Sequence, residues 1–87
     1  MLLQLYVLNG PNRGETHRLT QGTNYVGRSM DNDVRIDDRT VSRKHLRIFR
    51  ENERCFITDL KSRNGTFYRG SFITPGASVE VEQGFPI

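Results

Sequence analysis

Three segments of the chain carry side chains suited to binding an anion. They are Gly27-Arg28, Ser42-Arg43-Lys44-His45, and Asp59 together with Ser62-Arg63-Asn64-Gly65-Thr66. Each segment lies at the end of a short strand-like run, so a rigid sheet would let the intervening loops converge. A phosphate monoester has three acceptor oxygens and a charge of roughly −1.5 to −2, which an arginine fork, a hydroxyl and an amide together can bind. The sequence therefore predicts a phosphate receptor made of loops.

The elements that would position these loops are short strands. Turn-forming residues recur at short intervals, a spacing typical of an all-β sandwich or barrel, and no segment has a sustained helical period. Strands are expected at residues 3–8, 16–19, 25–27, 34–36, 45–50, 55–59, 66–68, 72–73 and 79–81. Alternation and apolar character predict the core residues Leu3, Leu5, Val7, Leu46, Ile48, Val26, Val34, Ile36, Phe56, Phe67, Phe72, Val79 and Val81. A shift of one residue would exchange the faces of any strand.

Length and cysteine content limit the class of protein. A chain of 87 residues makes one domain, near the size at which a single core suffices. One cysteine, Cys55, excludes an internal disulfide, and together with two histidines it is too small a set for a structural zinc site. We expect Cys55 to be a core residue in a reducing, cytoplasmic compartment. The first residues show neither a leader peptide nor a membrane-spanning run, and no metal or cofactor is expected.

The charge is modest but uneven. The formal net charge is +3, yet all thirteen basic residues lie between Arg13 and Arg69, and only two of them are lysines. Arginine is the better fork for phosphate. The alternative for any one arginine is a solvated face paired with nearby aspartates and glutamates, for example Arg28 with Asp31 or Asp33. Nucleic-acid binding is disfavoured because interleaved aromatics and a recognition helix are absent from the pattern.

The order and spacing of the three segments resemble those of the forkhead-associated (FHA) domain, a phosphothreonine-binding fold. The resemblance covers most of the chain. It implies an all-β fold, a two-sheet β-sandwich of short antiparallel strands with ligand-binding loops at one end, formed by residues 1–87 as a single domain. Because the last strand of the family pairs with the first, we expect this chain to be truncated at its C-terminus, cut from a longer multidomain protein, with residues 3–8 left as an open edge.

The resemblance also implies roles for individual residues. Arg28 and Ser42 would contact the phosphate, Arg43 would assist them, and Asn64 would bind the peptide backbone. Lys44 and Arg63 would hold the phosphate or select acidic neighbours. The site would be supported structurally by Gly27, His45, Asp59, Ser62, Gly65 and Thr66.

Two residues depart from the family pattern, and one group of residues suggests catalysis. Arg63 replaces a small or hydroxylated residue that touches the phosphothreonine in many members, and Arg69 replaces an asparagine common before Gly70, where the turn needs positive φ. Ser42, His45 and Asp59 could suggest a hydrolytic triad, but no nucleophile elbow or oxyanion loop accompanies them. We therefore predict that the chain is not an enzyme.

The predicted function is a phosphothreonine-peptide-binding module for phosphorylation-dependent interactions in signalling or transcriptional regulation. Its partner would be a phosphothreonine-containing protein or peptide, including phosphorylated segments of its own parent chain, and neither nucleic acid nor membrane. The alternative is a phosphate-independent interaction or dimerisation module with the same fold.

Overall fold

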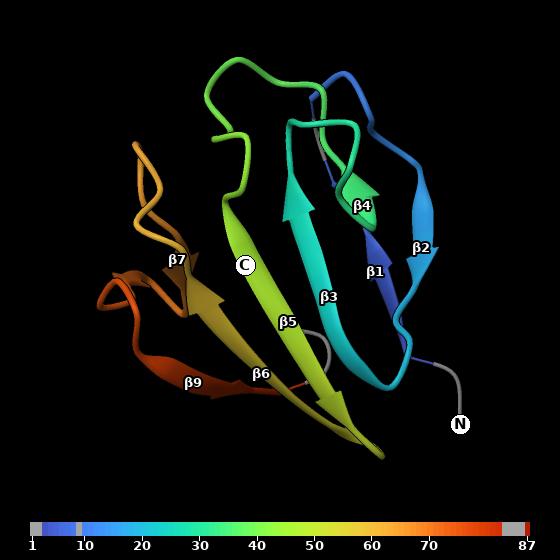
Figure 1. The fold of residues 1–87 in the computed structure, drawn as a ribbon, viewed down its shortest axis with the longest axis vertical. Helices are drawn as coiled ribbons and strands as arrows, with labels where there is room; N and C mark the ends of the chain where they lie inside the picture. The colour runs from blue at the N-terminus through green and yellow to red at the C-terminus, as the bar shows by residue number, and fades with distance from the viewer. Residues whose placement is uncertain (1–2, 9, 83–86) are drawn as a thin grey trace.

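The computed structural model describes residues 3–8, 10–82 and 87, and strands are its only regular elements (Figure 1). In chain order they are β1 (Gln4–Tyr6), β2 (Thr16–Arg18), β3 (Gly22–Gly27), β4 (Val34–Arg35), β5 (Leu46–Glu51), β6 (Arg54–Asp59), β7 (Phe67–Tyr68), β8 (Ser71–Phe72) and β9 (Ser78–Val81). Each predicted strand overlaps one of these. The all-β prediction is confirmed.

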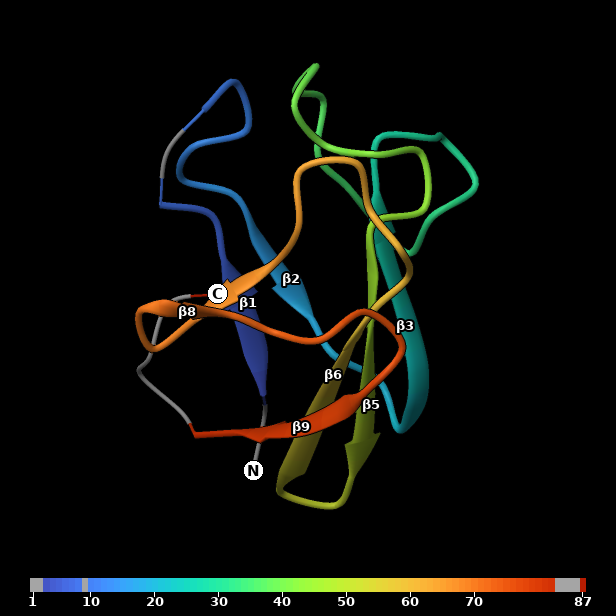
Figure 2. The same cartoon turned by 90° about the vertical axis from the view of Figure 1, so that its left-hand side faces the viewer.

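The strands form two layers. A five-stranded sheet has the order β4-β3-β5-β6-β9, and two hairpins, β1-β2 and β7-β8, supply the other layer. Figure 2 separates β1, β2 and β8 from β3 and β5, as expected for a sandwich. One pairing is parallel: Val26 of β3 lies opposite Val34 of β4. The sequence prediction of antiparallel strands did not include this parallel pair. Because β4 is so short, the loop of residues 28–33 can return along β3 and place β4 beside it in the same direction.

The core lies between the two layers. Its buried apolar residues are Leu3, Leu19, Val26, Val34, Leu46, Ile48, Ile57 and Tyr68. Five of these were predicted, namely Leu3, Val26, Val34, Leu46 and Ile48. Leu5, Ile36, Val79 and Val81 are partly buried against them, and so is Cys55. Burial raises the pKa of the Cys55 thiol, which keeps it neutral and consistent with a packing role.

Val7 and Phe56 were predicted in the core but are half-buried residues outside it. Two further core predictions are wrong because the residues are exposed, and both fall on one hairpin. Phe67 is 47% exposed and Phe72 is 62% exposed. These residues face each other across β7 and β8 with ring centroids 4.0 Å apart, so they cover each other on the outer face. The inward residue is Tyr68, whose hydroxyl accepts a hydrogen bond from the Glu82 amide. The predicted inward face was therefore shifted by one residue from the observed one. Strands of two residues have too few positions for the sequence pattern to show which face is buried.

The loops that carry the predicted site gather at one end of the sandwich (Figures 1 and 2). They are the β3–β4 loop (28–33), the β4–β5 loop (36–45) and the β6–β7 loop (60–66).

In the layer made of the two hairpins, β1 pairs only with β2 within the described part of the chain. Residues 83–86, next to the expected C-terminal truncation, lie outside the described residues.

Candidate functional site

A cleft of about 320 Å³ opens among the gathered loops. Its lining residues are Arg28, Arg39, Thr40, Val41, Ser42, Arg43, Lys44, Arg63 and Asn64. Six of them were predicted from the sequence, and five carry a positive charge. No aspartate or glutamate is among these lining residues. The cleft is therefore a cationic surface with a hydroxyl and an amide, which is the combination that suits a phosphate.

Gly27 lets two of the loops come together. A Cβ atom at this position would lie 2.2 Å from the carbonyl oxygen of Arg43 and 2.9 Å from the side-chain nitrogen (Nδ2) of Asn32. The close approach allows the amide of Arg28 to donate to the Ser42 carbonyl at 2.9 Å and the amide of Ser29 to donate to the Arg43 carbonyl at 3.2 Å. Any larger side chain at residue 27 would push the β4–β5 loop away from Arg28.

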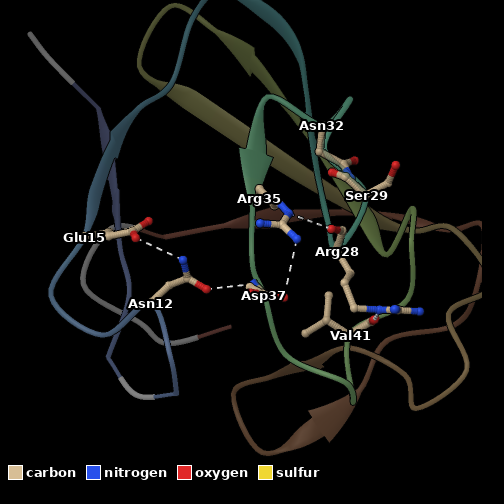
Figure 3. Close-up of polar contacts among 8 residues, drawn as sticks. All are labelled: Asn12, Glu15, Arg28, Ser29, Asn32, Arg35, Asp37 and Val41. Carbon is tan, nitrogen blue, oxygen red and sulfur yellow. Dashed lines mark hydrogen bonds and ion pairs between the residues drawn. The ribbon is translucent and has the colours of Figure 1, made fainter.

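The Arg28 guanidinium is fixed in direction. Its Nε donates to the Val41 carbonyl at 3.1 Å, which leaves the two Nη groups, with four N–H donors, as the outer prongs of the fork. Figure 3 shows the side chain running from β3 toward Val41. The alternative pairing of Arg28 with Asp31 or Asp33 does not occur: Asp31 pairs with Lys44, and Asp33 accepts from the Tyr25 amide.

A polar brace supports the backbone of Arg28 from outside the cleft (Figure 3). Arg35 donates from Nε to the Arg28 carbonyl at 3.0 Å and contacts Asp37 through Nη2 at 3.5 Å. The amide of Asp37 donates to the Asn12 side chain at 2.7 Å, and Asn12 in turn donates to Glu15. The brace links the first hairpin to the site. Sequence reasoning did not find it, because these polar residues lie far apart along the chain and carry no shared motif.

His45 connects the two other loops. Its Nδ1 accepts a hydrogen bond from the Ser42 amide at 3.0 Å, and its Nε2 lies 2.8 Å from the Gly65 carbonyl oxygen. An amide can only donate and a carbonyl can only accept, so these partners select the neutral imidazole with its proton on Nε2. His45 is buried, and we refer to this pair of bonds as the His45 clasp.

Two more hydrogen bonds, one to Ser42 and one from Asn64, cross the gap between the same two loops. The Ser42 hydroxyl oxygen accepts from the Arg63 amide at 2.8 Å, so its own proton remains available to a ligand. The Asn64 side-chain nitrogen donates to the Thr40 carbonyl at 2.6 Å, which leaves its oxygen available to accept. The β4–β5 and β6–β7 loops thus form two walls of the cleft that hydrogen bonds link to each other.

Asp59 organises the β6–β7 loop from below. It is 1% exposed and accepts from the Ser62 amide at 3.0 Å, from the Ser62 hydroxyl and from the Thr66 hydroxyl at 2.7 Å. Burial alone would raise the pKa of Asp59, but the hydrogen bonds from Ser62 and Thr66 hold it below its usual value. The carboxylate is therefore ionised at neutral pH. Gly65 follows with φ of +83°, and a Cβ there would lie 2.8 Å from the Phe72 ring.

The hydrogen bonds of Ser42, His45 and Asp59 do not form a hydrolytic triad. The His45 ring bonds to backbone groups on both sides, the Ser42 hydroxyl accepts from Arg63, and Asp59 accepts from Ser62 and Thr66. A general base must lie within hydrogen-bond reach of the proton it removes. These three side chains serve the loops instead.

Several site residues were absent from the sequence prediction. Arg39, Thr40 and Val41 line the cleft although they belong to no motif. Asn32 donates to the Ser29 carbonyl at 2.8 Å and to the Arg43 carbonyl at 2.7 Å, and so ties the β3–β4 loop to the β4–β5 loop. The only sequence signal for Asn32 was that it is an asparagine in a turn near Arg28. Asparagines are common in turns of every kind, so this signal is weak.

The fold and the cleft define a class: a small all-β sandwich that presents a cationic cleft on loops at one end. The model of the FHA domain family matches residues 24–87. The chain belongs to the FHA domain family.

Curated relatives support this assignment. The oxoglutarate dehydrogenase inhibitor of Corynebacterium jeikeium is 41% identical over 63 residues, which is 72% of this chain and 44% of the relative. The glycogen accumulation regulator GarA of Mycobacterium tuberculosis is also 41% identical over 63 residues, 72% of this chain and 39% of the relative. The chain thus spans less than half the length of these relatives, which are named as an inhibitor and a regulator.

Solved structures agree along nearly the whole chain. An FHA domain from Arabidopsis thaliana has a TM-score of 0.86 at 35% identity, covering 97% of this chain and 73% of that one. An FHA domain solved in a study of phosphothreonine-dependent FHA interactions has a TM-score of 0.86 at 29% identity, covering 98% and 83%. Among the described residues, no helix is long and apolar enough to cross a membrane.

Proposed function

We propose that this domain binds phosphothreonine peptides in the cationic cleft and has no catalytic activity. The observation that carries the proposal is the pairing of Arg28 and Ser42. The Ser42 carbonyl accepts from the Arg28 amide, so both side chains start from one point of the cleft. Arg28 keeps its Nη donors free of described partners, and Ser42 keeps its hydroxyl proton.

The remaining site residues take roles around this pair. Arg43 follows Ser42 and lines the cleft beside it, so its positive charge attracts the phosphate. Asn64 offers its side-chain oxygen to a peptide N–H from the opposite wall. The His45 clasp and the Asp59 hydrogen bonds hold these walls at a fixed separation, so little ordering is left for the ligand to impose.

The wider context of the domain follows from its relatives. We propose that it serves as one module of a longer cytoplasmic protein, where it recognises a phosphorylated partner or a phosphorylated segment of its own chain. The inhibitor and regulator names of the relatives support a role in signalling. Transcriptional control is one such setting.

The test is a titration with three matched peptide pools that carry phosphothreonine, phosphoserine or unmodified threonine, at near-physiological salt. We expect binding only to the phosphothreonine pool. Arg28→Ala should weaken it about tenfold or more, because a hydrogen bond to a charged group contributes about 1.5 to 3 kcal/mol. Arg47→Ala is the matched control, since Arg47 is exposed on β5 and does not line the cleft.

The outcome can also favour the alternative function. Equal binding to phosphorylated and unmodified peptides, by a folded domain, would replace the phosphothreonine reader with a phosphate-independent interaction module. Concentration-dependent dimerisation without peptide binding would point to the edge of β1 that no strand pairs with among the described residues.

A further inference from the structure

The cleft and the fold each require one residue of the Asn64-Gly65 pair. Asn64 lines the cleft, and its side-chain nitrogen donates to the Thr40 carbonyl at 2.6 Å. Residue 65 must be glycine, because its φ is +83° and a Cβ atom there would lie 2.8 Å from the Phe72 ring. Glycine has no Cβ to shield its own nitrogen, so an asparagine before it is open to attack by that nitrogen. The fold therefore keeps a chemically reactive pair in a wall of the cleft.

Both reacting groups of this pair are accessible. Asn64 is exposed and Gly65 is half-buried. The Gly65 amide donates no hydrogen bond to any residue that the structure describes, whereas the Gly65 carbonyl oxygen lies 2.8 Å from His45 Nε2 in the clasp. The clasp thus restrains the carbonyl, which takes no part in the reaction, and leaves the nitrogen free. Solvent can reach the pair to remove the amide proton and to supply water.

The charge of the cleft favours the same reaction. The Gly65 nitrogen attacks as an anion, and its addition to the side-chain carbonyl of Asn64 places negative charge on Oδ1. Five cationic side chains line the cleft to which Asn64 belongs, and no carboxylate is among the lining residues. Fixed positive groups stabilise an anion that develops near them. Arg63, the preceding residue, is the nearest of these cations along the chain.

We propose that Asn64 is a site of spontaneous deamidation, and that the modified cleft binds phosphopeptides poorly. Hydroxide removes the Gly65 amide proton, and the nitrogen forms a bond to Cγ of Asn64. The bond from Cγ to Nδ2 breaks, and Nδ2 leaves as ammonia with a proton from water, which regenerates the hydroxide. Water then opens the cyclic imide, either at Cγ to give aspartate or at the backbone carbonyl carbon to give isoaspartate.

The products would not serve the cleft as asparagine does. An aspartate carboxylate has no N–H, so the contact with the Thr40 carbonyl would bring two acceptors together. Its negative charge would also compete with the phosphate for the arginines. Isoaspartate would in addition insert an extra carbon into the backbone of the wall. The loss of binding rests on the proposed function, whereas the chemical conversion does not.

A bound phosphopeptide should protect Asn64 from this reaction. The phosphate balances the positive charge of the cleft, and the peptide backbone engages the Asn64 oxygen and restrains its side chain. The empty domain would therefore lose its binding activity with time, while the occupied domain would keep it.

The experiment follows the purified domain as it ages at mildly alkaline pH. Peptide mapping by mass spectrometry, compared with an unaged sample, locates the conversion and separates Asn64 from Asn9, which also precedes a glycine. Parallel samples contain a phosphothreonine peptide selected from the pool, its unphosphorylated form, or urea to unfold the chain. Arg63→Gln and the control Arg47→Gln are aged beside the wild type. Asn64→Asp is prepared directly for titration, and urea unfolding checks that it is folded.

We expect Asn64 to convert in the folded domain to both aspartate and isoaspartate. The phosphothreonine peptide should slow the conversion, and its unphosphorylated form should not. Arg63→Gln should slow it about two- to fivefold, the scale of one exposed charge contact, whereas Arg47→Gln should leave the rate unchanged. The aged domain and Asn64→Asp should both bind the phosphothreonine peptide about tenfold or more weakly than the fresh wild type.

Four results would count against the inference. If Asn64 stays intact in the folded domain while it converts in urea, the folded loop prevents the reaction. If Arg63→Gln converts as fast as the wild type, the electrostatic cause is wrong. If Asn64→Asp and the aged domain bind the phosphopeptide as well as the fresh domain, the modification does not control binding and the proposed function stands. If the fresh folded domain binds no phosphopeptide, the proposed function fails, and the loss of binding inferred here fails with it.

Discussion

Replacing His45 with alanine tests whether the clasp sets the shape of the cleft. The substitution removes both partners of the clasp, the acceptor for the Ser42 amide at 3.0 Å and the donor to the Gly65 carbonyl at 2.8 Å. Leaving a buried polar group unpaired costs about 1 to 3 kcal/mol. With two such groups, and water able to reach part of the exposed rim, we expect the free energy of unfolding to fall by about 2 to 4 kcal/mol.

The same change should weaken ligand binding. Ser42 and Asn64 stand on the two walls that the clasp joins, so its loss leaves the peptide to order both loops on binding. We expect affinity for a phosphothreonine peptide to drop about tenfold or more, as typical of a lost preorganising contact. His45→Gln is the informative companion, because its amide offers one donor and one acceptor and should recover part of both losses.

Urea unfolding gives the stability change, and calorimetric titration below the unfolding transition gives the affinity. The reasoning would be refuted by an alanine variant whose unfolding free energy and affinity both match those of the wild type. A loss of stability with unchanged affinity would mean that the walls keep their separation without the clasp. In that case the prediction for stability would be correct and the prediction for binding would be wrong.

Two further predictions concern Asp59 and Arg69. Because the folded-state pKa of Asp59 lies below its usual 3.8, its ionised form stabilises the fold fully above that value, and the contribution is lost as the pH falls through the lower folded-state pKa. The difference in unfolding free energy between wild type and Asp59→Asn, measured by urea unfolding from neutral to acid pH, should therefore shrink below about pH 4; a difference independent of pH would exclude this origin. Arg69 has φ of 53° in a two-residue hairpin turn with Gly70, where asparagine is favoured, so Arg69→Asn should stabilise the domain by about 0.5 to 1 kcal/mol. That gain should raise the midpoint of thermal unfolding by a few degrees, whereas a lower midpoint would mean that the contact of Arg69 with Glu82 at 3.8 Å outweighs the turn.

The strand pattern was predictable because turn residues and β-branched or aromatic runs alternate so regularly. All nine expected strands correspond to strands in the structure, and the core follows where a strand is long enough to show alternation. The prediction was wrong on β7 and β8, where Phe67 and Phe72 are exposed and Tyr68 is buried. A two-residue strand has one residue on each face, so local pattern cannot decide which side is inside.

The site was predictable only in its motif residues. Arg28, Ser42 and Asn64 fall in segments whose order along the chain is informative. Asn12 and Asn32 are polar loop residues whose partners are backbone groups of distant segments, and nothing in the local sequence identifies those partners. Arg39 lines the cleft because of the course that the β4–β5 loop takes, which the local sequence does not reveal.

Different residues of the cleft hold its shape and present free side chains to its interior. The walls are fixed by backbone amides and carbonyls, with His45 and Asp59 as their buried partners. The side chains of Arg39, Arg43 and Arg63 make no hydrogen bond to that frame within the described residues. Substitution at these three positions should therefore alter ligand preference at little cost to folding. Descendants of one ancestral domain can acquire new targets in this way through single surface mutations, without any need to rebuild the scaffold.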